Sequence, residues 1–468
     1  MSGSSDTYDV IVIGGGAAGE NAAWYARDNG LSVALIEREL VGGECSYWAC
    51  MPSKALLRPG EALAAARRVP GAADAVTGEV DADATLGSRD AFASNWDDKH
   101  QVQWVESTGT TLMRGHGRLA GDRTVEVTNA DGTTRTLTAD RGVVVATGSS
   151  AAIPPVEGLG DIAVWDSRDI TSAKEIPERL LFLGGGVVGV EMAQAFRRLG
   201  ATEVTIVEMA DRLLANEEPF VGEELQAAFD EEGVTVLTGA EAVRVEREGT
   251  GPVTLTLADG MQLTADEIVV ATGRTPNSAD LGLEAVGLEP GGYLETNEQL
   301  RVAGVDGGWL YAVGDVNGRA LLTHHGKYQA RLVGDHLAGR PVDARADRDA
   351  VVRVVYTDPQ VAAVGMTLAA AREKGIDATA LSYGIGDVAG GALLGKGVSG
   401  TAHLVVDTAS RTIVGATFTG PGVGEMVHAA TIAIISKVTL DDLWHAVPAF
   451  PTISEVWLRL LEAERGIE

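Results

Sequence analysis

The stretch YDVIVIGGGAAGENAAWYARDNGLSVALIER, residues 8–38, decides the fold of the first part of the chain. An apolar run, a glycine cluster, an amphipathic stretch and a second apolar run predict strand, tight turn, helix and strand. Gly14, Gly16 and Gly19 form G-x-G-x-x-G, and Glu37 ends the second strand. In such a unit the glycines allow the turn, a close pyrophosphate and helix packing, while the acid binds a ribose hydroxyl. The stretch therefore predicts a dinucleotide-binding fold.

The same pattern returns in residues 180–209, which read LLFLGGGVVGVEMAQAFRRLGATEVTIVEM. Its glycine motif consists of Gly184, Gly186 and Gly189. Glu208 ends the second strand, where a carboxylate accepts from a free ribose 2′-hydroxyl and repels a 2′-phosphate. Arg212, the nearest cation, lies four residues further on. The repeat predicts a second nucleotide, NADH in preference to NADPH, and hydride transfer to another carrier.

Later segments extend the repeat and then depart from it. VVVATGSS at 143–150 and IVVATGRTPN at 268–277 predict late strands of two similar domains. From about residue 350, alternating apolar runs predict an antiparallel sheet with helices and a separate C-terminal domain. A helix is expected over 324–338, and the Ala/Asp-rich stretch 70–90 is expected to be a loop or a poorly constrained insert.

Composition excludes several classes of function. Lys plus Arg (37) against Asp plus Glu (66) gives a net charge of −29, which argues against nucleic acid or an anionic membrane as partner. No apolar run reaches the roughly 18 residues that span a bilayer, and the start MSGSSDTYDV does not resemble a signal peptide. Two cysteines are too few for a secreted disulfide scaffold, so we expect a cytoplasmic protein.

The two cysteines lie close together in GGECSYWACMPSKALLRP, with four residues between Cys45 and Cys50. A structural zinc site needs four ligands, and the chain has no other cysteine, so no metal is expected. Pro52 and the Ala/Leu-rich run predict a helix that begins near Cys50, and a helix N-terminus stabilises a thiolate. The segment predicts a redox-active pair, with inert buried thiols as the alternative.

Together these motifs resemble the flavoprotein disulfide reductases, the class I pyridine nucleotide-disulfide oxidoreductases that include dihydrolipoamide dehydrogenase. The order matches nearly the whole chain: GGGAAG, C-x4-C-x-P-S-K, GGGVVGVE, ATGRTPN, YAVGD and VVYTDPQVAAVG. The resemblance implies an α/β protein with two Rossmann-like dinucleotide-binding domains and a C-terminal α+β dimerisation domain. The implied ranges are 1–150 and 276–348 for FAD, 151–275 for NAD and 349–468 for dimerisation.

The resemblance also implies roles for single residues. Cys45 matches the interchange thiol that meets the substrate, and Cys50 the thiol against the flavin. Lys54 and Glu191 match an ion pair beside the flavin. The alternative for these two is an ordinary surface lysine and helix glutamate.

Further positions match the residues that hold the cofactors. Asp315 matches the residue that binds the FAD ribityl chain, and the helix near His324 the one that faces the flavin pyrimidine. His324 and His325 themselves are expected to cap or pack rather than catalyse. The other expected cofactor contacts are Gly43, Thr147, Gly148 and Gly273.

One position departs from the family. The catalytic base is a His in H-P-T-x-x-E, contributed across a homodimer interface, but here the stretch begins with Phe450 and ends with Glu455. His445, five residues upstream, could replace the base only after a local rearrangement. Tyr47 and Trp48, between the cysteines, either reshape the entrance to the disulfide or pack in the core.

The missing His makes the expected acceptor a non-standard small molecule. The leading hypothesis is electron flow from NADH through FAD to Cys45–Cys50 and then to that acceptor. A diaphorase or quinone reductase, a lipoamide dehydrogenase-like subunit of a multienzyme complex and a non-catalytic flavin-binding protein are the alternatives. Mercuric reduction is expected to be disfavoured, because the chain ends in ERGIE with no cysteine pair.

Overall fold

The computed structural model describes residues 6–467, and its contacts divide the chain into two compact units. Unit 1 comprises Met1–Pro52, Asp90–Ala152 and Arg274–Arg348. Unit 2 comprises Ser53–Arg89, Ile153–Gly273 and Asp349–Glu468. The four domain ranges expected from the sequence stay a prediction.

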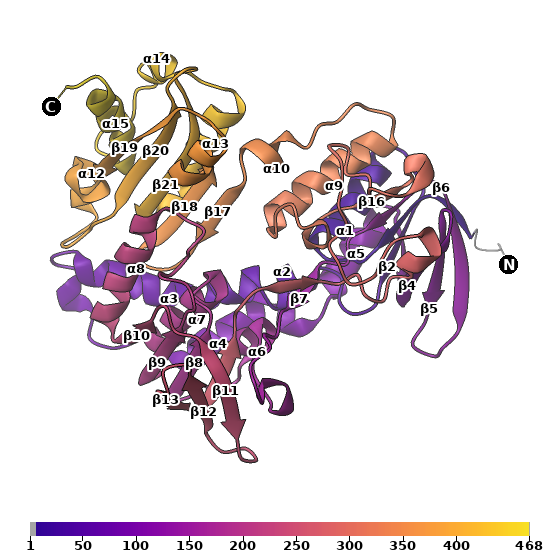
Figure 1. Cartoon of the computed structure of the whole chain (residues 1–468), viewed down its shortest axis with the longest axis horizontal. Helices are drawn as coiled ribbons and strands as arrows, with labels where there is room; N and C mark the ends of the chain where they lie inside the picture. Colours follow the sequence, from indigo (N-terminus) through magenta and orange to yellow (C-terminus); the bar gives the residue numbers. More distant parts are fainter. Residues whose placement is uncertain (1–5, 468) are drawn as a thin grey trace. The chain divides into compact units, whose positions relative to one another are not determined.

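Unit 1 is built on a seven-stranded sheet (Figure 1). Its strands, in spatial order, are β3 (Thr111–Arg114), β2 (Val33–Glu37), β1 (Thr7–Ile13), β6 (Thr134–Val145), β5 (Thr124–Thr128) and β4 (His116–Gly121), and β16 (Leu310–Ala312) also pairs with β6. The pairs among β3, β2, β1, β6 and β16 are parallel, while β5 and β4 add antiparallel strands. Apolar residues are buried on both faces, as a parallel sheet requires.

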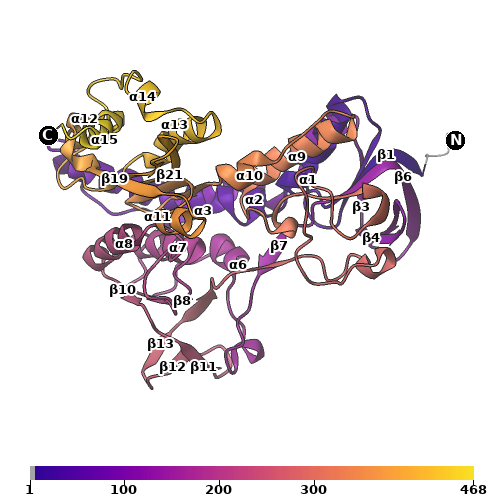
Figure 2. The same cartoon turned by 45° about the horizontal axis from the view of Figure 1, so that its top comes forward.

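Unit 1 also contains helices, of which α1 and α5 pack on the sheet. They are α1 (Ala17–Asp28), α2 (Gly43–Tyr47), α5 (Lys99–Ser107), α9 (Thr323–Leu337) and α10 (Arg345–Asp349), with short 3-10 turns η2 (Ser94–Trp96), η4 (Leu283–Val286), η5 (Asp306–Gly308) and η6 (Asp315–Asn317). Helices α1 and α9 lie side by side in both views (Figures 1 and 2). Glycine at position 334 allows this close approach. A Cβ there would lie only 2.5 Å from the Tyr25 Cβ, which is too short for two carbon atoms. A two-stranded ribbon joins β7 (Ser149–Ala151) to β15 (Arg274–Pro276).

Unit 2 contains a second, smaller parallel sheet with a similar strand arrangement. Its strands, in spatial order, are β10 (Val234–Leu237), β9 (Glu203–Val207), β8 (Arg179–Leu183) and β14 (Glu267–Val270). An antiparallel sheet follows with β11 (Ala242–Arg247), β12 (Val253–Leu257) and β13 (Gln262–Ala265). The helices are α3 (Cys50–Arg68), α4 (Ala82–Phe92), α6 (Ser167–Ser172), α7 (Val187–Arg198) and α8 (Pro219–Glu232), with η1 (Ala73–Ala75) and η3 (Leu159–Asp161). As β1 pairs with β6, so β8 pairs with β14, which confirms the predicted late strands.

The C-terminal part of unit 2 is the antiparallel sheet expected from about residue 350. Its strands, in spatial order, are β17 (Val352–Val355), β18 (Gln360–Gly365), β21 (Thr412–Gly420), β20 (Thr401–Asp407) and β19 (Ala378–Gly384). Helix α13 (Val423–Ile435) packs on β18 and β21. The remaining elements are α11 (Leu368–Glu373), η7 (Ile385–Asp387), α12 (Ala389–Leu393), α14 (Leu440–Leu443), η8 (Ile453–Glu455) and α15 (Val456–Glu464). Across residues 6–467 we find no helix with the length and hydropathy of a membrane span.

Two local predictions had opposite outcomes. The helix expected over 324–338 is confirmed by α9. The loop expected over 70–90 is wrong in its second half, where α4 begins at Ala82. Leu86 is buried in the core. Arg89 is fully buried, and its guanidinium donates to the carbonyls of residues 171 and 173.

Candidate active site and cofactor sites

The first glycine motif forms the turn between β1 and α1. Gly14 has φ +100°, and a Cβ on Gly19 would overlap the Gly14 carbonyl oxygen, so both positions need glycine. The Glu37 carboxylate binds this turn. Its Oε2 accepts from the Gly15 amide at 2.5 Å, and its Oε1 accepts from the Glu39 amide at 2.6 Å. The structure therefore brings together the motif and the acid that the sequence paired.

The N-terminus of α1 fits the pyrophosphate of a dinucleotide. Gly16 is its N-cap, and no side chain in the described part of the chain caps the first amides. Gly43 closes over the turn so tightly that a Cβ there would lie 2.8 Å from the Gly16 Cα. Bare amides at a helix N-terminus, with no Cβ above them, suit an anionic group. The geometry around Gly14, Gly16, Gly43 and Glu37 thus fits a dinucleotide.

The second motif repeats this geometry between β8 and α7. Gly184 has φ +104°, and a Cβ on Gly189 would overlap the Gly184 carbonyl oxygen. Glu208 accepts from the Gly185 amide and the Ala210 amide, both at 2.6 Å. A Cβ on the N-cap residue, position 186, would meet no atom of the described residues within 4 Å. This motif therefore fits a second nucleotide.

The surroundings of Glu208 contain little that could bind a 2′-phosphate. Met209, the next residue, is 74% exposed and carries no charge. Arg212 is engaged elsewhere, because it donates to the Ala215 carbonyl at 2.8 Å and pairs with Asp211 at 3.0 Å. The carboxylate therefore sets the charge at this position.

The two cysteines lie together as thiols. Cys45 belongs to α2, and α3 begins at Cys50, as predicted. The Cys50 Sγ lies 3.2 Å from the hydroxyl of Thr323, the first residue of α9. A hydrogen bond with Cys50, and then burial, raise the pKa of Cys45 above its usual range. These two effects favour the neutral form of Cys45.

The aromatic pair between the cysteines packs against the fold. Tyr47 is fully buried, and its hydroxyl donates to the Val41 carbonyl at 3.0 Å. The Trp48 ring lies edge-on to the Tyr47 ring, with centroids 5.7 Å apart. For Tyr47 the structure supports packing in the core.

Lys54 and Glu191 form the expected ion pair within unit 2. The Lys54 Nζ lies 2.8 Å from the Glu191 Oε2, and the Glu191 side chain is only 3% exposed. The other carboxylate oxygen accepts from the Tyr356 amide at 2.9 Å, and the lysine lies 4.9 Å from the centre of the Tyr356 ring. A buried carboxylate needs such partners. Sequence reasoning missed Tyr356, although it lies within the quoted VVYTDPQ segment.

Hydrogen bonds join the segments that carry the expected cofactor contacts Thr147, Gly148 and Asp315. The Thr147 hydroxyl donates to the Asn277 carbonyl at 2.7 Å, and the Asn277 amide donates to the Gly148 carbonyl at 2.9 Å. The Ser149 hydroxyl donates to Asp315 at 2.6 Å. Three segments distant in sequence therefore meet in unit 1, where Arg274 and Asn277 of the ATGRTPN motif both bond to residues 147–149.

The two histidines of α9 have different surroundings. His324 is exposed at the second position of the helix. His325 is buried, and its Nδ1 lies 2.8 Å from an Asp347 carboxylate oxygen, which fits the expected packing role. Gly273, which follows β14, has φ +147° and therefore favours glycine.

The segment where a His was expected is open to solvent in the single chain. Phe450 is 75% exposed and belongs to unit 2, whereas the thiol pair belongs to unit 1. Glu455 is buried, and its Oε1 accepts from Arg459 at 2.6 Å. Its Oε2 is buried without a hydrogen-bond partner anywhere in residues 6–467. His445 is exposed.

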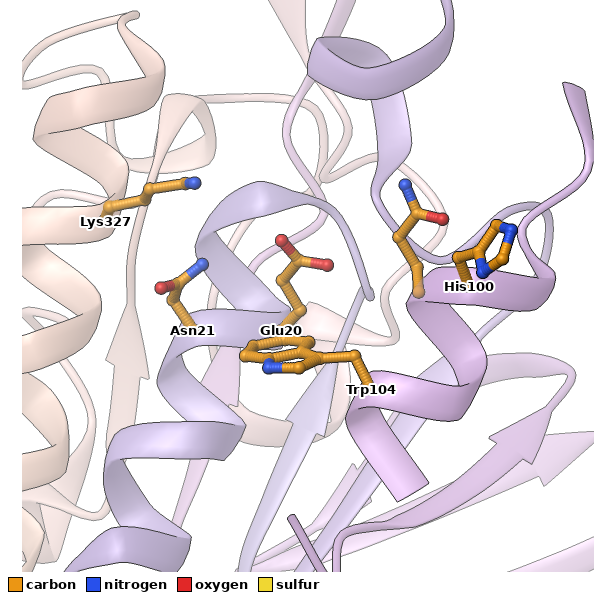
Figure 3. Close-up of a pocket in the computed structure, with 6 residues that line it drawn as sticks. Glu20, Asn21, His100, Trp104 and Lys327 are labelled. Atoms are coloured by element: carbon orange, nitrogen blue, oxygen red, sulfur yellow. The ribbon is translucent and has the colours of Figure 1, made fainter. Parts of the chain in front are cut away.

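A pocket of about 320 Å³ in unit 1 was not predicted from the sequence. It is lined by Glu20, Asn21, His100, Gln101, Trp104 and Lys327 (Figure 3). Burial raises the pKa of Glu20 to about 7, and the Lys327 charge opposes this shift. The only signal in the sequence was an acid directly after the third glycine of the motif. In the described residues, no group of three or more His, Cys, Asp or Glu side chains could hold a metal ion.

Comparison with known proteins agrees with this geometry. The family described as pyridine nucleotide-disulphide oxidoreductase matches residues 8–330, and its dimerisation domain matches residues 351–460. A mercuric reductase of Staphylococcus aureus is 31% identical over 96% of this chain and 81% of its own. A dihydrolipoyl dehydrogenase of Chlorobaculum tepidum is 33% identical over 96% of this chain and 95% of its own.

A solved structure gives the same result for the fold. The crystal structure of LpdA from Mycobacterium tuberculosis has a TM-score of 0.85 and 26% identity, and it covers 97% of this chain and 99% of its own. The α/β architecture with a C-terminal dimerisation domain is thereby confirmed. Members of this family bind FAD and use a pyridine nucleotide. The chain belongs to the pyridine nucleotide-disulphide oxidoreductases.

Proposed function

We propose that this protein is an NADH-dependent FAD flavoprotein that reduces a small-molecule acceptor through Cys45 and Cys50. The supporting observation is the pair of neighbouring thiols at the start of α3, with Cys50 against Thr323. Bound FAD would supply electron transfer between the pyridine nucleotide and the thiol pair. The residue roles implied by the resemblance are part of this proposal.

The thiols have unequal tasks. The positive end of the α3 dipole favours negative charge on Cys50. The hydrogen bond with Cys50 and burial favour the neutral form of Cys45. Cys45 therefore attacks the acceptor only after its proton has moved to a base, and Cys50 then closes the disulfide.

Glu208 supports NADH as the donor. Its carboxylate is held against the glycine turn by two backbone amides, where a 2′-phosphate would be repelled. Arg212 does not compensate, since it binds Ala215 and Asp211. We infer the same preference in solution.

A homodimer and an unusual acceptor both follow from the segment around Phe450. The chain has the family's dimerisation domain, and Val447 and Phe450 are 88% and 75% exposed in one copy. A second copy that covers them would place phenylalanine where relatives with H-P-T-x-x-E place a base. Phenylalanine cannot move a proton, so we infer an acceptor other than lipoamide. A cytoplasmic location fits a working thiol pair, since that compartment keeps thiols reduced.

Phenylalanine at position 450 also favours a second candidate, a quinone reductase that does not use the thiols. Such an enzyme has no need of a proton donor beside Cys45. Cys45→Ser separates the two functions, because the substitution removes only the attacking thiol.

The test follows flavin absorbance in stopped flow. We expect NADH to reduce the flavin at least tenfold faster than NADPH, and two-electron reduction to give a long-wavelength band from the Cys50 thiolate. Cys45→Ser should keep the fast reduction by NADH and lose at least 99% of disulfide reduction. Equal rates with NADPH would refute the role of Glu208, and full acceptor turnover by Cys45→Ser would refute the thiol route.

A further inference from the structure

The pocket in unit 1 brings together polar groups whose hydrogen-bonding capacity is unmet (Figure 3). Glu20 lies in the first turn of α1, and Gln101 lies on α5. The Glu20 Oε2 and the Gln101 Oε1 are both buried, and neither accepts a hydrogen bond from residues 6–467. Buried acceptors of this kind are costly unless a bound molecule supplies the donor. Two of them in one pocket therefore indicate a ligand that donates hydrogen bonds.

Lys327 supplies the opposite charge. Its side chain extends from α9 toward Glu20 (Figure 3), and none of the described residues forms a hydrogen bond or ion pair with its ammonium group. Lys327 and Glu20 thus line one pocket without pairing with each other, although the lysine charge still lowers the Glu20 pKa. A molecule between them meets a negative group at one end and a positive group at the other.

An aromatic surface forms the third part of the pocket. The exposed Trp104 ring lies beside the Glu20 side chain (Figure 3), and the exposed Trp24 ring packs edge-on against it with centroids 6.1 Å apart. Exposed indole rings offer apolar contact to a ligand. The volume of about 320 Å³ is at the lower end of the range for ligand pockets, so the ligand is small.

We infer that this pocket binds a zwitterionic α-amino acid with an apolar side chain. Glu20 and Gln101 accept hydrogen bonds from its ammonium group, Lys327 donates to its carboxylate, and its side chain packs on Trp104. This site goes beyond the proposed function, because its evidence includes neither the thiol pair nor the identity of the electron acceptor.

The test measures binding to the flavin-loaded protein by titration calorimetry at about pH 8, where the Glu20 carboxylate predominates. The probes are L-phenylalanine, phenethylamine and 3-phenylpropionate, which share a ring but carry both charges, only the positive one and only the negative one. We expect a dissociation constant of about 0.1 mM for L-phenylalanine. Each analogue should bind at least about tenfold more weakly, because it loses one charged hydrogen-bonding group.

Two substitutions should produce reciprocal losses. Glu20→Gln should weaken L-phenylalanine and phenethylamine at least about tenfold and leave 3-phenylpropionate within about threefold. Lys327→Met should weaken L-phenylalanine and 3-phenylpropionate by a similar factor and leave phenethylamine unchanged. Glu106→Gln and Lys99→Met, exposed and charge-matched controls on α5, should change none of the three. A misfolded variant would instead lose all three probes together.

The pH dependence gives a second readout. The groups that face Glu20 are Lys327 from α9, His100 from α5 and Tyr47 from α2. Burial raises the Glu20 pKa to about 7, and only the ionised form pairs with an ammonium group. L-phenylalanine should therefore bind about tenfold more weakly at about pH 6 than at about pH 8. Glu20→Gln should reduce that difference to less than about twofold.

Three results would overturn the inference. The first is the absence of L-phenylalanine binding to the flavin-loaded protein. The second is phenethylamine binding as tight as that of L-phenylalanine, because a simple cation would then suffice. The third is equal weakening of all three probes by Glu20→Gln or by Lys327→Met. None of these results depends on Cys45→Ser, so the amino-acid site and the thiol route can fail separately.

Discussion

The two glycine turns, one before α1 and one before α7, are alike up to their third glycine. In each, the first glycine has φ near +100°, and its carbonyl oxygen lies where a Cβ on the third would stand. In each, an acid accepts from the amide of the residue that follows the first glycine. Glu37 lies 23 residues after Gly14 and accepts at 2.5 Å, and Glu208 lies 24 residues after Gly184 and accepts at 2.6 Å. The shared contacts hold the helix N-terminus open for a nucleotide.

The turns diverge at the next two residues. Gly19 is followed by Glu20 and Asn21, while the second motif continues with Val190 and Glu191. Val190 is fully buried in the core of unit 2, and Glu191 turns to Lys54. Glu20 faces a pocket instead. One position on equivalent helices therefore packs a core in one unit and supplies a titratable group in the other.

The loops that close the two turns also differ. The Gly42 amide donates to the Gly15 carbonyl at 2.8 Å, and the Leu214 amide donates to the Gly185 carbonyl at 3.0 Å. In the first turn the closing residue, Gly42, has no side chain, so backbone lies against backbone. The first turn is therefore less tolerant of added atoms than the second.

This asymmetry gives the largest expected effect. Gly43→Ala places a Cβ 2.8 Å from the Gly16 Cα at φ +57°, so we expect loss of more than about 90% of the bound flavin. Gly186→Ala places its Cβ in space clear of the described atoms, so flavin should stay bound. The KM for NADH should then rise at least about tenfold, because the backbone can no longer approach the pyrophosphate. Flavin content and steady-state kinetics measure both effects.

Gly87→Ala is the matched control for these substitutions. It adds a Cβ to α4, again clear of the described atoms, and should change neither flavin content nor the KM for NADH. Full flavin occupancy in Gly43→Ala would show that the two turns are equally tolerant.

Glu20 gives the second effect, on stability. Its folded pKa of about 7 lies above the ordinary value of 4.5, so its contribution to stability is fully present below pH 4.5 and is lost as pH rises through about 7. The loss amounts to roughly 3 kcal/mol. Glu20→Gln should remove this pH dependence, whereas Glu106→Gln should retain it. Denaturant unfolding between about pH 5 and pH 8 measures it, and parallel curves for Glu20→Gln and the unmodified protein would contradict it.

The smallest effect concerns the missing imidazole. Phe450→His should raise lipoamide turnover at least about tenfold, because general acid–base catalysis is worth about 10²–10⁴-fold and a dry site offsets part of it. The Glu455 Oε2 has no hydrogen-bond partner in residues 6–467, and we expect it to orient the new ring. Phe450→Leu is the control and should give no gain. Lipoamide turnover by the unmodified protein equal to that of Phe450→His would mean that another group already moves the proton.

Local rules explain what could be predicted. The turn of Gly14 and Gly19, the start of α3 at Cys50 and the extent of α9 depend on residues close in sequence. The loop predicted over 70–90 failed because α4 is stabilised from a distance, through the burial of Leu86 and the carbonyls that Arg89 reaches. Composition gives no sign of such partners.

By itself, the sequence determined the two dinucleotide folds, the thiol pair and the absence of a His at Phe450, because each is written in residue identity and short spacing. Only the tertiary structure decided which residues lie next to these groups. Thr323 reaches Cys50, Tyr356 fixes Glu191, and Lys327 acts on both Glu20 and Cys45. These contacts join segments more than 150 residues apart, and burial and charge are properties of such neighbourhoods. A carboxyl that in the sequence is an ordinary helix glutamate thus acquires a pKa of about 7 only once the chain has folded around it.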